Sequence, residues 1–249
     1  MTKTSKTWEA RVLTLFPNMF PGILGDAAAG RGIENGLWSL KTINIRDFAT
    51  DQHGTVDDQP FGGGPGMVMR ADILASAIDK VHPKDTGEPI IYLSPRGRLL
   101  TQERVKRLSS GPGITIICGR FEGIDERILN ARGIEEISVG DYILSGGEPA
   151  AQILLDSCVR LIPGIIGKTD SLIEESFENG LLEYPHYTRP RDFEGQNVPE
   201  VLLSGDHERI RYWRNQQSEI ITQNRRTDLW DKYLKLSRSN RRGQGYEHN

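Results

Sequence analysis

Residues 138–151 read SVGDYILSGGEPAA, a stretch that begins as a strand and ends in the apolar, helix-like segment 149–162. Between the two lies the pair Gly146-Gly147. A glycine pair has no Cβ atoms, so its backbone can adopt positive φ and lie against a ligand. Pro149 suits the first turn of a helix. The pattern is typical of a binding loop, but its spacing alone favours an ordinary tight turn from a strand into a helix.

The charge of the chain is unevenly distributed. The 249 residues carry a net charge of −3, but residues 206–242 contain ten Lys or Arg against five Asp or Glu. A nearly neutral chain can therefore still bind nucleic acid through its basic C-terminal part. The length favours a division into a large and a smaller unit.

The two cysteines, Cys118 and Cys158, each lie inside an apolar run. This setting predicts two buried thiols rather than a disulfide or a metal site, and it fits a reducing cytoplasm. The first residues lack the apolar core of a signal peptide, and no apolar run approaches the roughly 20 residues of a membrane span. We therefore expect a soluble, cytoplasmic protein with no membrane partner.

Short apolar strands alternate with helices along the first two thirds of the chain. Strands are predicted over residues 10–16, 40–45, 89–93, 114–118 and 136–139. Helices are predicted near residues 23–29, over 72–81, from a cap at Thr101 to about residue 109, near 124–131 and over 149–162. This alternation predicts an α/β fold with a parallel sheet covered on both faces.

Three segments, residues 46–69, 163–176 and 181–205, lack this alternation, and two further helices are predicted after them. Residues 46–69 form a long polar loop, and a structureless loop of that length in a compact domain is usually functional or disordered. Residues 163–176 are rich in Gly, Ser and acids and predict a linker. After the irregular residues 181–205, Asp206 should cap a helix and residues 229–236 should form another, which gives a small helical domain.

Glycines follow three of the predicted strands, at Gly97, at Gly119 and Gly123, and from Gly140 to Gly147. Ligands of open α/β sheets bind beyond the carboxyl ends of the strands, so these three ends should converge on one cleft. The chain contains no G-x-x-x-x-G-K-[ST] motif. It also has no G-x-G-x-x-G at a strand-to-helix turn followed by an acid about 20 residues later. A nicotinamide or ATP enzyme is therefore disfavoured.

Six blocks of sequence occur in the same order as in the bacterial tRNA (guanine-N1)-methyltransferases, and the chain resembles this family from about residue 8 to residue 213. The blocks are LFPNMF (15–20), DDQPFGGGPGMVM (57–69), YLSPRGR (92–98), CGRFEGIDER (118–127), SVGDYILSGGE (138–148) and PHYTRP (185–190). The resemblance implies a SPOUT-type α/β domain whose C-terminal part forms a deep trefoil knot, an obligate homodimer, and a helical C-terminal domain. The general rule that chains avoid knots would argue against the knot.

The resemblance also implies the domains and the activity. It divides the chain into a knotted domain (1–163) that binds S-adenosylmethionine, a flexible linker (164–176) and a helical tRNA-binding domain (177–249). The implied reaction transfers a methyl group from S-adenosylmethionine to N1 of the guanine immediately 3′ of the anticodon in tRNA, with Mg²⁺ assisting. Two alternatives are a catalytically silent RNA-binding protein of the same fold and a ribose 2′-O-methylating relative. The latter would not be expected to carry the guanine-directed blocks.

The cofactor residues implied by the resemblance come from the three glycine-bearing strand ends. They are Tyr92, Leu93, Ser94, Gly119, Glu122, Gly123, Val139, Gly140, Tyr142, Leu144, Gly146, Gly147 and Pro149. An adenine needs an apolar slot with backbone hydrogen bonds, which these strand ends can supply. Core packing explains Val139 and Leu144 equally well, and the two roles are compatible.

The tRNA-binding residues implied by the resemblance lie in the glycine-rich loop, the PHYTRP block and the basic tail. They are Asp57, Asp58, Gly62, Gly63, Gly64, Pro65, Gly66, His186, Arg189, Arg209, Arg211 and Arg214. Aspartates are often simply turn residues, but a carboxylate can accept a hydrogen bond from the guanine amino group. The glycines could equally form a flexible turn, His186 could be an ordinary loop residue, and the arginines could form a solvated helix face.

Two residues are the implied catalytic pair. Methylation at N1 of guanine requires removal of a proton and stabilisation of negative charge at O6. By the resemblance, Glu175 is the general base and Arg160 the stabilising cation. The family places Asp where this chain has Glu175, which motivates the silent alternative. Glu175 could instead be a solvated linker acid, with Glu174 or Asp170 as the base, and Arg160 could simply pair with Asp156 on the surface.

Overall fold

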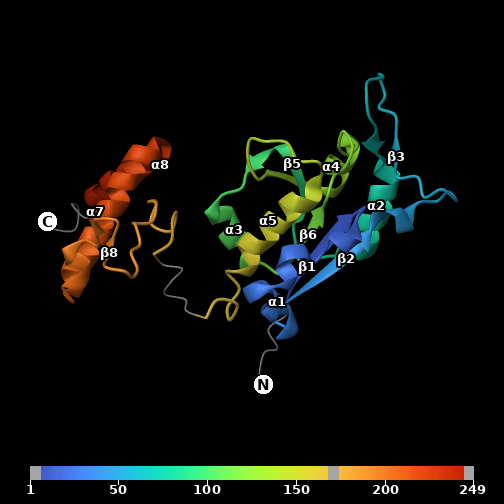
Figure 1. Cartoon of the computed structure of the whole chain (residues 1–249). Coiled ribbons are helices and arrows are strands. Elements are labelled where there is room, and N and C mark those ends of the chain that lie inside the picture. Colours follow the sequence, from blue (N-terminus) through green and yellow to red (C-terminus); the bar gives the residue numbers. More distant parts are fainter. Residues whose placement is uncertain (1–6, 168–173, 244–249) are drawn as a thin grey trace. The chain divides into compact units, whose positions relative to one another are not determined.

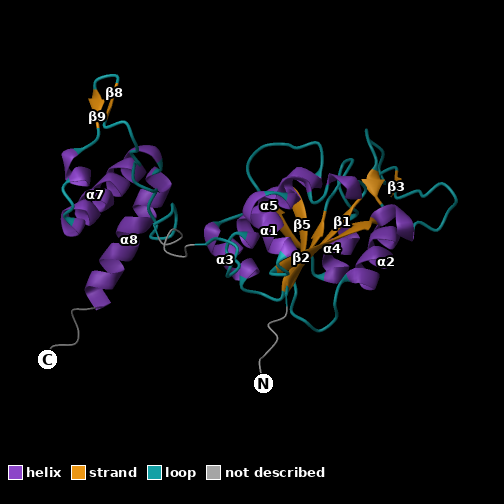
Figure 2. Cartoon of the chain, turned by 60° about the horizontal axis from the view of Figure 1, so that its bottom comes forward, coloured by secondary structure: helices purple, strands orange, loops and turns teal. Residues whose placement is uncertain are grey.

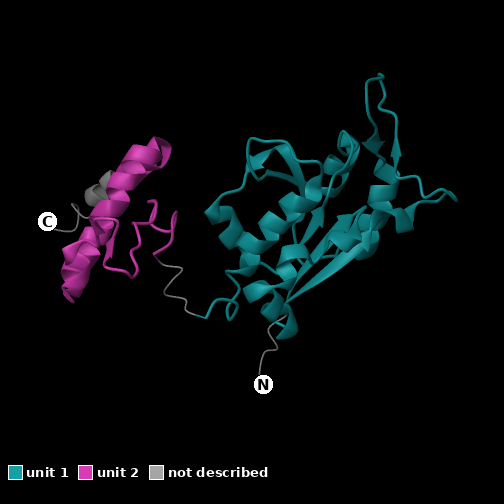
Figure 3. Cartoon of the chain, viewed as in Figure 1, with its two compact units in different colours: residues 1–167 teal, residues 168–249 magenta. Residues whose placement is uncertain are grey.

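The structure is a computed structural model that describes residues 7–167 and 174–243 (Figure 1). The chain divides into two compact units, residues 1–167 and residues 168–249 (Figure 3). The boundary lies inside the predicted linker range 164–176, part of which, residues 168–173, is outside the described residues. Each unit is described by itself below.

Unit 1 is built on a parallel sheet of five strands in the order β2-β1-β6-β5-β7 (Figure 1). The strands are β1 (Trp8–Thr14), β2 (Trp38–Asn44), β5 (Ile90–Leu99), β6 (Gly113–Ile117) and β7 (Glu135–Ser138). All neighbouring strands pair in parallel, as the alternation of strands and helices predicts. The middle strand, β6, is buried at every residue, which explains its continuous apolar run.

Helices cover both faces of this sheet (Figure 2). One face packs against α1 (Ala27–Glu34), α3 (Gln102–Ser109) and α5 (Gly147–Val159). The other face packs against α2 (Ala71–Val81) and α4 (Glu126–Arg132). Successive residues of a strand point to opposite faces. Accordingly, Ile91 of β5 belongs to the first core and Tyr92 to the second.

Three sequence-based expectations need correction. The helix expected near residues 23–29 is a 3-10 helix, η2 (Gly22–Gly25), followed by α1. The strand expected over residues 89–93 continues to Leu99, because the chain bulges after Leu93 and then pairs with β7 again. The segment 46–69 is not structureless.

Within and beside that polar segment the chain forms short elements. They are η3 (Ile45–Phe48) and the antiparallel pair β3 (Asp57–Asp58) and β4 (Val68–Met69); a further short 3-10 helix, η1 (Pro17–Met19), follows β1. Strands of two residues have no apolar periodicity, so sequence alone gives no sign of them. The pairing of β3 with β4 holds together the two ends of the glycine-rich loop.

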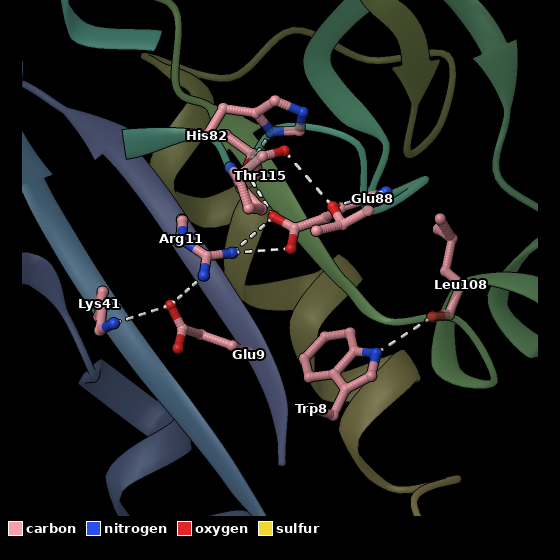
Figure 4. Close-up of polar contacts among 10 residues, drawn as sticks. Trp8, Glu9, Arg11, Lys41, His82, Glu88, Leu108 and Thr115 are labelled. Carbon is pink, nitrogen blue, oxygen red and sulfur yellow. Dashed lines mark hydrogen bonds and ion pairs between the residues drawn. The ribbon is translucent and has the colours of Figure 1, made fainter. Parts of the chain in front are cut away.

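A buried ion-pair network joins β1 and β6 to the segment that precedes β5 (Figure 4). Arg11 Nη1 donates to both carboxylate oxygens of Glu88 at 2.7 Å, and Thr115 Oγ1 donates to Glu88 Oε1 at 2.7 Å. His82 Nδ1, just after α2, lies 3.1 Å from Thr115 Oγ1. The Glu88 side chain is only 1% exposed, so its charge needs these partners.

Unit 2 contains two long helices, α7 (His207–Arg225) and α8 (Thr227–Gly243), where the sequence predicts helices. It also contains a hairpin of β8 (Asp192–Phe193) and β9 (Gln196–Asn197), and the 3-10 helix η4 (Glu200–Leu203). Asp206 caps α7 as expected, because its Oδ1 accepts hydrogen bonds from the amides of Glu208 and Arg209 at 3.1 Å. Across the described ranges of both units, no helix is sufficiently long and apolar to span a membrane.

Candidate active site

One pocket of about 290 Å³ is lined by residues at the bulge of β5 and by the glycine-bearing segments that follow β6 and β7. Its wall includes these predicted cofactor residues: Tyr92, Leu93, Ser94, Gly119, Glu122, Gly123, Val139, Gly140, Tyr142, Leu144, Gly146 and Gly147. Pro149 is not among the lining residues; it lies in the first turn of α5, where proline suits the helix start. The segments after β6 and β7 converge with Tyr92–Ser94 as expected, but Gly97 lies farther along β5 and is not among the lining residues.

Close contacts between the strand ends explain the glycines there. The Gly147 amide donates to the Gly119 carbonyl at 2.9 Å, which joins two of the three ends. A Cβ atom on Gly147 would lie 2.7 Å from Cys118 Cα, and one on Gly119 would lie 2.6 Å from the Tyr92 ring. Neither position can carry a side chain unless its neighbours move. The glycine pair is thus more than an ordinary turn, because one of its members brings two pocket walls together.

The turn after β7 offers backbone groups and an aromatic ring to the pocket. Gly140 has φ of 156°, and the Ser138 hydroxyl accepts from its amide at 3.2 Å and donates to its carbonyl at 3.0 Å. The Tyr142 hydroxyl donates to the Val139 carbonyl at 3.4 Å. These hydrogen bonds fix the turn that places Tyr142 in the pocket wall.

The sequence argument missed two pocket residues inside the block CGRFEGIDER. Arg120 lines the pocket and forms an ion pair with the fully buried Glu148, at 2.9 Å. Phe121 also lines it and has φ of 58°, a conformation that residues other than glycine adopt rarely. Both residues lie in the quoted block, but the sequence around Arg120 is also typical of an exposed arginine, so its buried partner could not be predicted. The further lining residues are Pro95, Ile137, Ser138, Ile143, Ser145 and Ala150.

The end of the glycine-rich loop contacts Glu122, a residue of the pocket wall. A Cβ atom on Gly66 would lie 2.4 Å from Glu122 Oε1, and the Glu122 amide donates to the Met67 carbonyl at 2.9 Å. Asp57 and Asp58 belong to β3 at the base of the loop. The predicted substrate loop is therefore attached to the wall of the predicted cofactor pocket.

The tip of the same loop is open. Gly62, Gly63 and Gly64 have φ of 92°, 75° and 125°, and a Cβ atom on any of them would meet nothing within 4 Å. Pro65 is exposed as well. Phe61, which the sequence argument also missed, is 98% exposed. The tip thus presents a bare aromatic ring beside backbone groups that no side chain covers.

Glu175 lies in a second pocket, of about 260 Å³, within unit 2, together with Arg211 and Arg214 of α7. The neighbouring Glu174 accepts hydrogen bonds from the Tyr184 hydroxyl and from Arg214 Nη1, the latter at 3.3 Å. The Arg214 guanidinium lies 4.7 Å above the centre of the Tyr184 ring. Burial and the hydrogen bond to Glu174 raise the pKa of Tyr184 to about 12, so the phenol keeps its proton.

The remaining predicted substrate residues of unit 2 lie on its surface. His186 is exposed, contacts Glu183, and has its ring centre 4.8 Å from that of Tyr184. Arg189 is exposed and precedes the cis proline Pro190. Arg209 is exposed and lines a shallow groove on α7 with Tyr212 and Trp213.

The two predicted catalytic residues belong to different units. Arg160 is the C-cap residue of α5 in unit 1, with its amide donating to the Asp156 carbonyl at 3.2 Å. Glu175 belongs to unit 2, and Asp170, the other alternative base, lies outside the described residues. Neither unit by itself therefore holds both members of the pair.

Two further expectations concern metal and cysteine chemistry. The described residues contain no group of three or more His, Cys, Asp or Glu side chains that could hold a metal ion, so they offer no such site for Mg²⁺. Cys118 and Cys158 are buried free thiols, as predicted. Burial raises the pKa of Cys118 far above its usual value and that of Cys158 to about 12.

Residues 9–232 match the family described as tRNA (guanine-1)-methyltransferase TrmD. A tRNA (guanine-N(1)-)-methyltransferase of Rhodopseudomonas palustris (strain HaA2) is 61% identical over 224 residues, which cover 90% of this chain and 88% of that protein. The protein of the same name from Mesorhizobium japonicum is 60% identical over 223 residues, 90% of this chain and 96% of its own length. That from Rhodospirillum rubrum is 58% identical over 236 residues, 95% of this chain and 98% of its own length.

Proposed function

The chain belongs to the tRNA (guanine-1)-methyltransferase family, and we propose that it methylates N1 of the guanine immediately 3′ of the anticodon in tRNA, with S-adenosylmethionine as the methyl donor. The observation that carries this proposal is the pocket lined by β5 and by the glycine-bearing segments that follow β6 and β7. S-adenosylmethionine, when bound there, supplies a methyl group on a sulfonium centre. The turn from Val139 to Leu144 would hold its adenosine part through backbone groups and apolar contacts.

The proton chemistry falls to Glu175 in this proposal. N1 of guanine carries a proton and is a poor nucleophile, so a carboxylate must accept that proton as the methyl group is transferred. Glu175 lines a pocket of unit 2 together with Arg211 and Arg214, and this location supports its assignment as the base. The reference pKa values of Asp and Glu, about 3.9 and 4.3, are similar enough for Glu to replace the family's Asp.

Arg160 has the complementary role. Removal of the N1 proton shifts negative charge onto O6 of the guanine, and a permanently charged guanidinium can be held where that charge develops. Arg160 directly follows α5, at the opposite end of that helix from the residues that line the cofactor pocket, and its assignment rests on the family resemblance.

We infer that the active form is a homodimer in which one subunit provides the cofactor pocket and the other provides Glu175. This inference is supported by the assignment of the pocket and Glu175 to different units. A trefoil knot in the C-terminal part of unit 1 belongs to the same proposal and rests on the family resemblance. Mg²⁺ assistance and a cytoplasmic location stay proposals that rest on the family alone.

The proposed tRNA contacts come from both units. In unit 1, the carboxylates of Asp57 and Asp58 can accept hydrogen bonds from guanine, and the Phe61 ring offers a flat face for stacking on a base. In unit 2, Arg209 and Arg211 are exposed and can contact phosphates.

The experiment that tests the function is methyl transfer from labelled S-adenosylmethionine to a tRNA with guanine 3′ of its anticodon. Glu175→Gln keeps the size of the side chain but removes its basicity, so the rate should fall by roughly two to four orders of magnitude. Cofactor and tRNA binding should stay close to wild type, and Glu175→Asp should stay active. The matched control is Glu174→Gln, which removes the adjacent carboxylate.

The outcomes separate the alternatives. A wild-type protein that binds this tRNA and transfers no methyl group would favour the silent RNA-binding alternative. If Glu175→Gln is as active as wild type and Glu174→Gln is not, the base has been assigned to the wrong carboxylate. Mixing subunits altered at Gly140 with subunits altered at Glu175 should restore some activity, and a complete lack of restoration would contradict the shared site.

A further inference from the structure

A cluster of side chains at the edge of the cofactor pocket has no role in the chemistry proposed above. It consists of Thr14, Phe16, Arg120, Ser145 and Glu148, and we call it the arginine cluster. Its members come from the end of β1, the loop after β6, and the junction between the 140–147 loop and α5. The cluster therefore connects segments that are far apart in the sequence.

Glu148 is the buried acid of the arginine cluster, and its side chain is fully inaccessible to solvent. Thr14 Oγ1 donates to Glu148 Oε1 at 2.6 Å, and Arg120 Nη2 lies 2.9 Å from Glu148 Oε2. Within the described part of the chain, Oε2 accepts no well-aligned hydrogen bond. The positive charge of Arg120 is thus what compensates this end of the carboxylate, which would otherwise be costly to bury.

Arg120 also holds the loop that closes the pocket. Its Nη1 donates to the Ser145 carbonyl at 3.0 Å, and its guanidinium carbon lies 4.2 Å from the centre of the Phe16 ring. A Cβ atom on Gly146 would lie 2.5 Å from both the guanidinium carbon and Nε of Arg120. The arginine side chain is only 18% exposed, so it is packed between Phe16 and the backbone of the loop.

The same contacts account for the block LFPNMF, to which the methyl-transfer chemistry assigns no role. Phe16 supplies the ring under the guanidinium, and Met19 Sδ lies 3.7 Å from Arg120 Nη2. Gln152 of α5 donates from Nε2 to the Met19 carbonyl at 3.0 Å. The segment after β1 is thereby fixed to the helix that begins at the pocket.

We propose that Arg120 is a positioning residue that, through Ser145 and Glu148, holds the 140–147 loop in the conformation that binds the methyl donor. This inference rests on the proposed function, because it takes S-adenosylmethionine as the ligand of the pocket. The loop carries Tyr142 and Leu144 into the pocket wall, so its displacement weakens the contacts with the adenosine part. Affinity for the donor should suffer more than the rate constant of the chemical step.

The test compares Arg120→Met and Arg120→Lys with a matched control, Arg127→Met. Arg127 follows in the same block, is 75% exposed, and pairs only at the surface with Asp125, at 2.6 Å. Isothermal titration with S-adenosylhomocysteine should give an affinity about tenfold or more weaker for Arg120→Met, because this variant cannot form the charge-assisted bond to the loop. Arg120→Lys should recover part of the affinity, and Arg127→Met should bind like wild type.

A double variant separates positioning from general stability. Arg120→Met leaves the buried charge of Glu148 uncompensated, and adding Glu148→Gln removes that charge. The double variant should therefore regain thermal stability but not ligand affinity. If affinity returns together with stability, or if folded Arg120→Met binds like wild type, Arg120 does not position the loop.

Hydrogen exchange of the ligand-free proteins distinguishes this inference from the proposed function. Amides of residues 140–147 should exchange faster in Arg120→Met than in wild type, whereas those of α2 should be unchanged. Equal exchange in the loop would overturn the positioning role. Faster loop exchange in a protein whose wild type fails to bind S-adenosylhomocysteine would preserve the role of Arg120 and refute the proposed methyl donor.

Discussion

Gly147→Ala tests whether the close contact between two strand ends shapes the cofactor pocket. A Cβ atom at this position would lie 2.7 Å from Cys118 Cα, 2.9 Å from the Gly119 amide nitrogen and 3.1 Å from the Cys118 carbonyl carbon. All three neighbours are backbone atoms, so no side-chain rotation relieves the overlap. Ordinary contact distances start at 3.4 Å, and the two strand ends must therefore separate by several tenths of an ångström.

The size of the effect follows from the cost of overpacking. Inserting a methyl group into a well-packed region costs about 1–3 kcal/mol. For a unit of this size each kcal/mol lowers Tm by about 2–4 °C, so Tm should fall by roughly 2–12 °C. If the separation of the pocket walls carries the same cost into binding, affinity for S-adenosylhomocysteine should fall by about 5- to 150-fold.

Gly167→Ala is the matched control, because a Cβ atom on Gly167 would meet nothing within 4 Å. Thermal unfolding and titration calorimetry with S-adenosylhomocysteine measure the two effects, and Gly167→Ala should behave like wild type in both. The reasoning is refuted if Gly147→Ala has the same Tm as wild type and its affinity for S-adenosylhomocysteine is within about twofold of the wild-type value. Both costs derive from one steric overlap.

Three further predictions concern charge, thiols and pH. Replacing Arg209, Arg211 and Arg214 with Gln should reduce the magnitude of the slope of log tRNA affinity against log salt concentration. The reduction should be about one for each phosphate that is no longer neutralised. Affinity for S-adenosylhomocysteine should not change, and an unchanged slope would make these arginines ordinary surface charges. Cys118 and Cys158 should not react with a thiol reagent at pH 8 until the protein is denatured, because burial raises the pKa of both thiols, and rapid labelling of the native protein would contradict this. Burial lowers the pKa of His82 below 6.5, an effect that Arg11 strengthens and Glu88 opposes. As the pH falls through 6.5 the unfolded chain therefore binds a proton at His82 before the folded chain does, and the free energy of unfolding should decrease. In urea titrations His82→Gln should remove that part of the decrease, and an identical decrease in the variant would exclude His82 as its source.

Local sequence signals were sufficient for most of the regular structure and for the location of the pocket. Apolar runs of strand length identify the strands of the parallel sheet, and Thr101 and Asp206 mark the starts of two helices because their side chains can accept hydrogen bonds from the first turn. The glycines that follow β6 and β7 indicate the pocket, since the carboxyl ends of parallel strands meet at one edge of the sheet, whereas Gly97 does not line it. The apolar surroundings of Cys118 and Cys158 are enough to predict their burial.

The tertiary structure alone decided which polar residues act together. Arg120, Glu148 and Thr14 are separated by long stretches of chain, and each by itself has the sequence context of a turn, a helix start or a strand end. The same holds for the pairing of β3 with β4, whose two-residue strands have no periodicity of their own. Local propensity acts over a few neighbouring residues, whereas a buried charge or a short strand persists only when a distant segment supplies its partner. Charge compensation at Glu148 therefore became visible only once the fold had brought the end of β1, the loop after β6 and the start of α5 together.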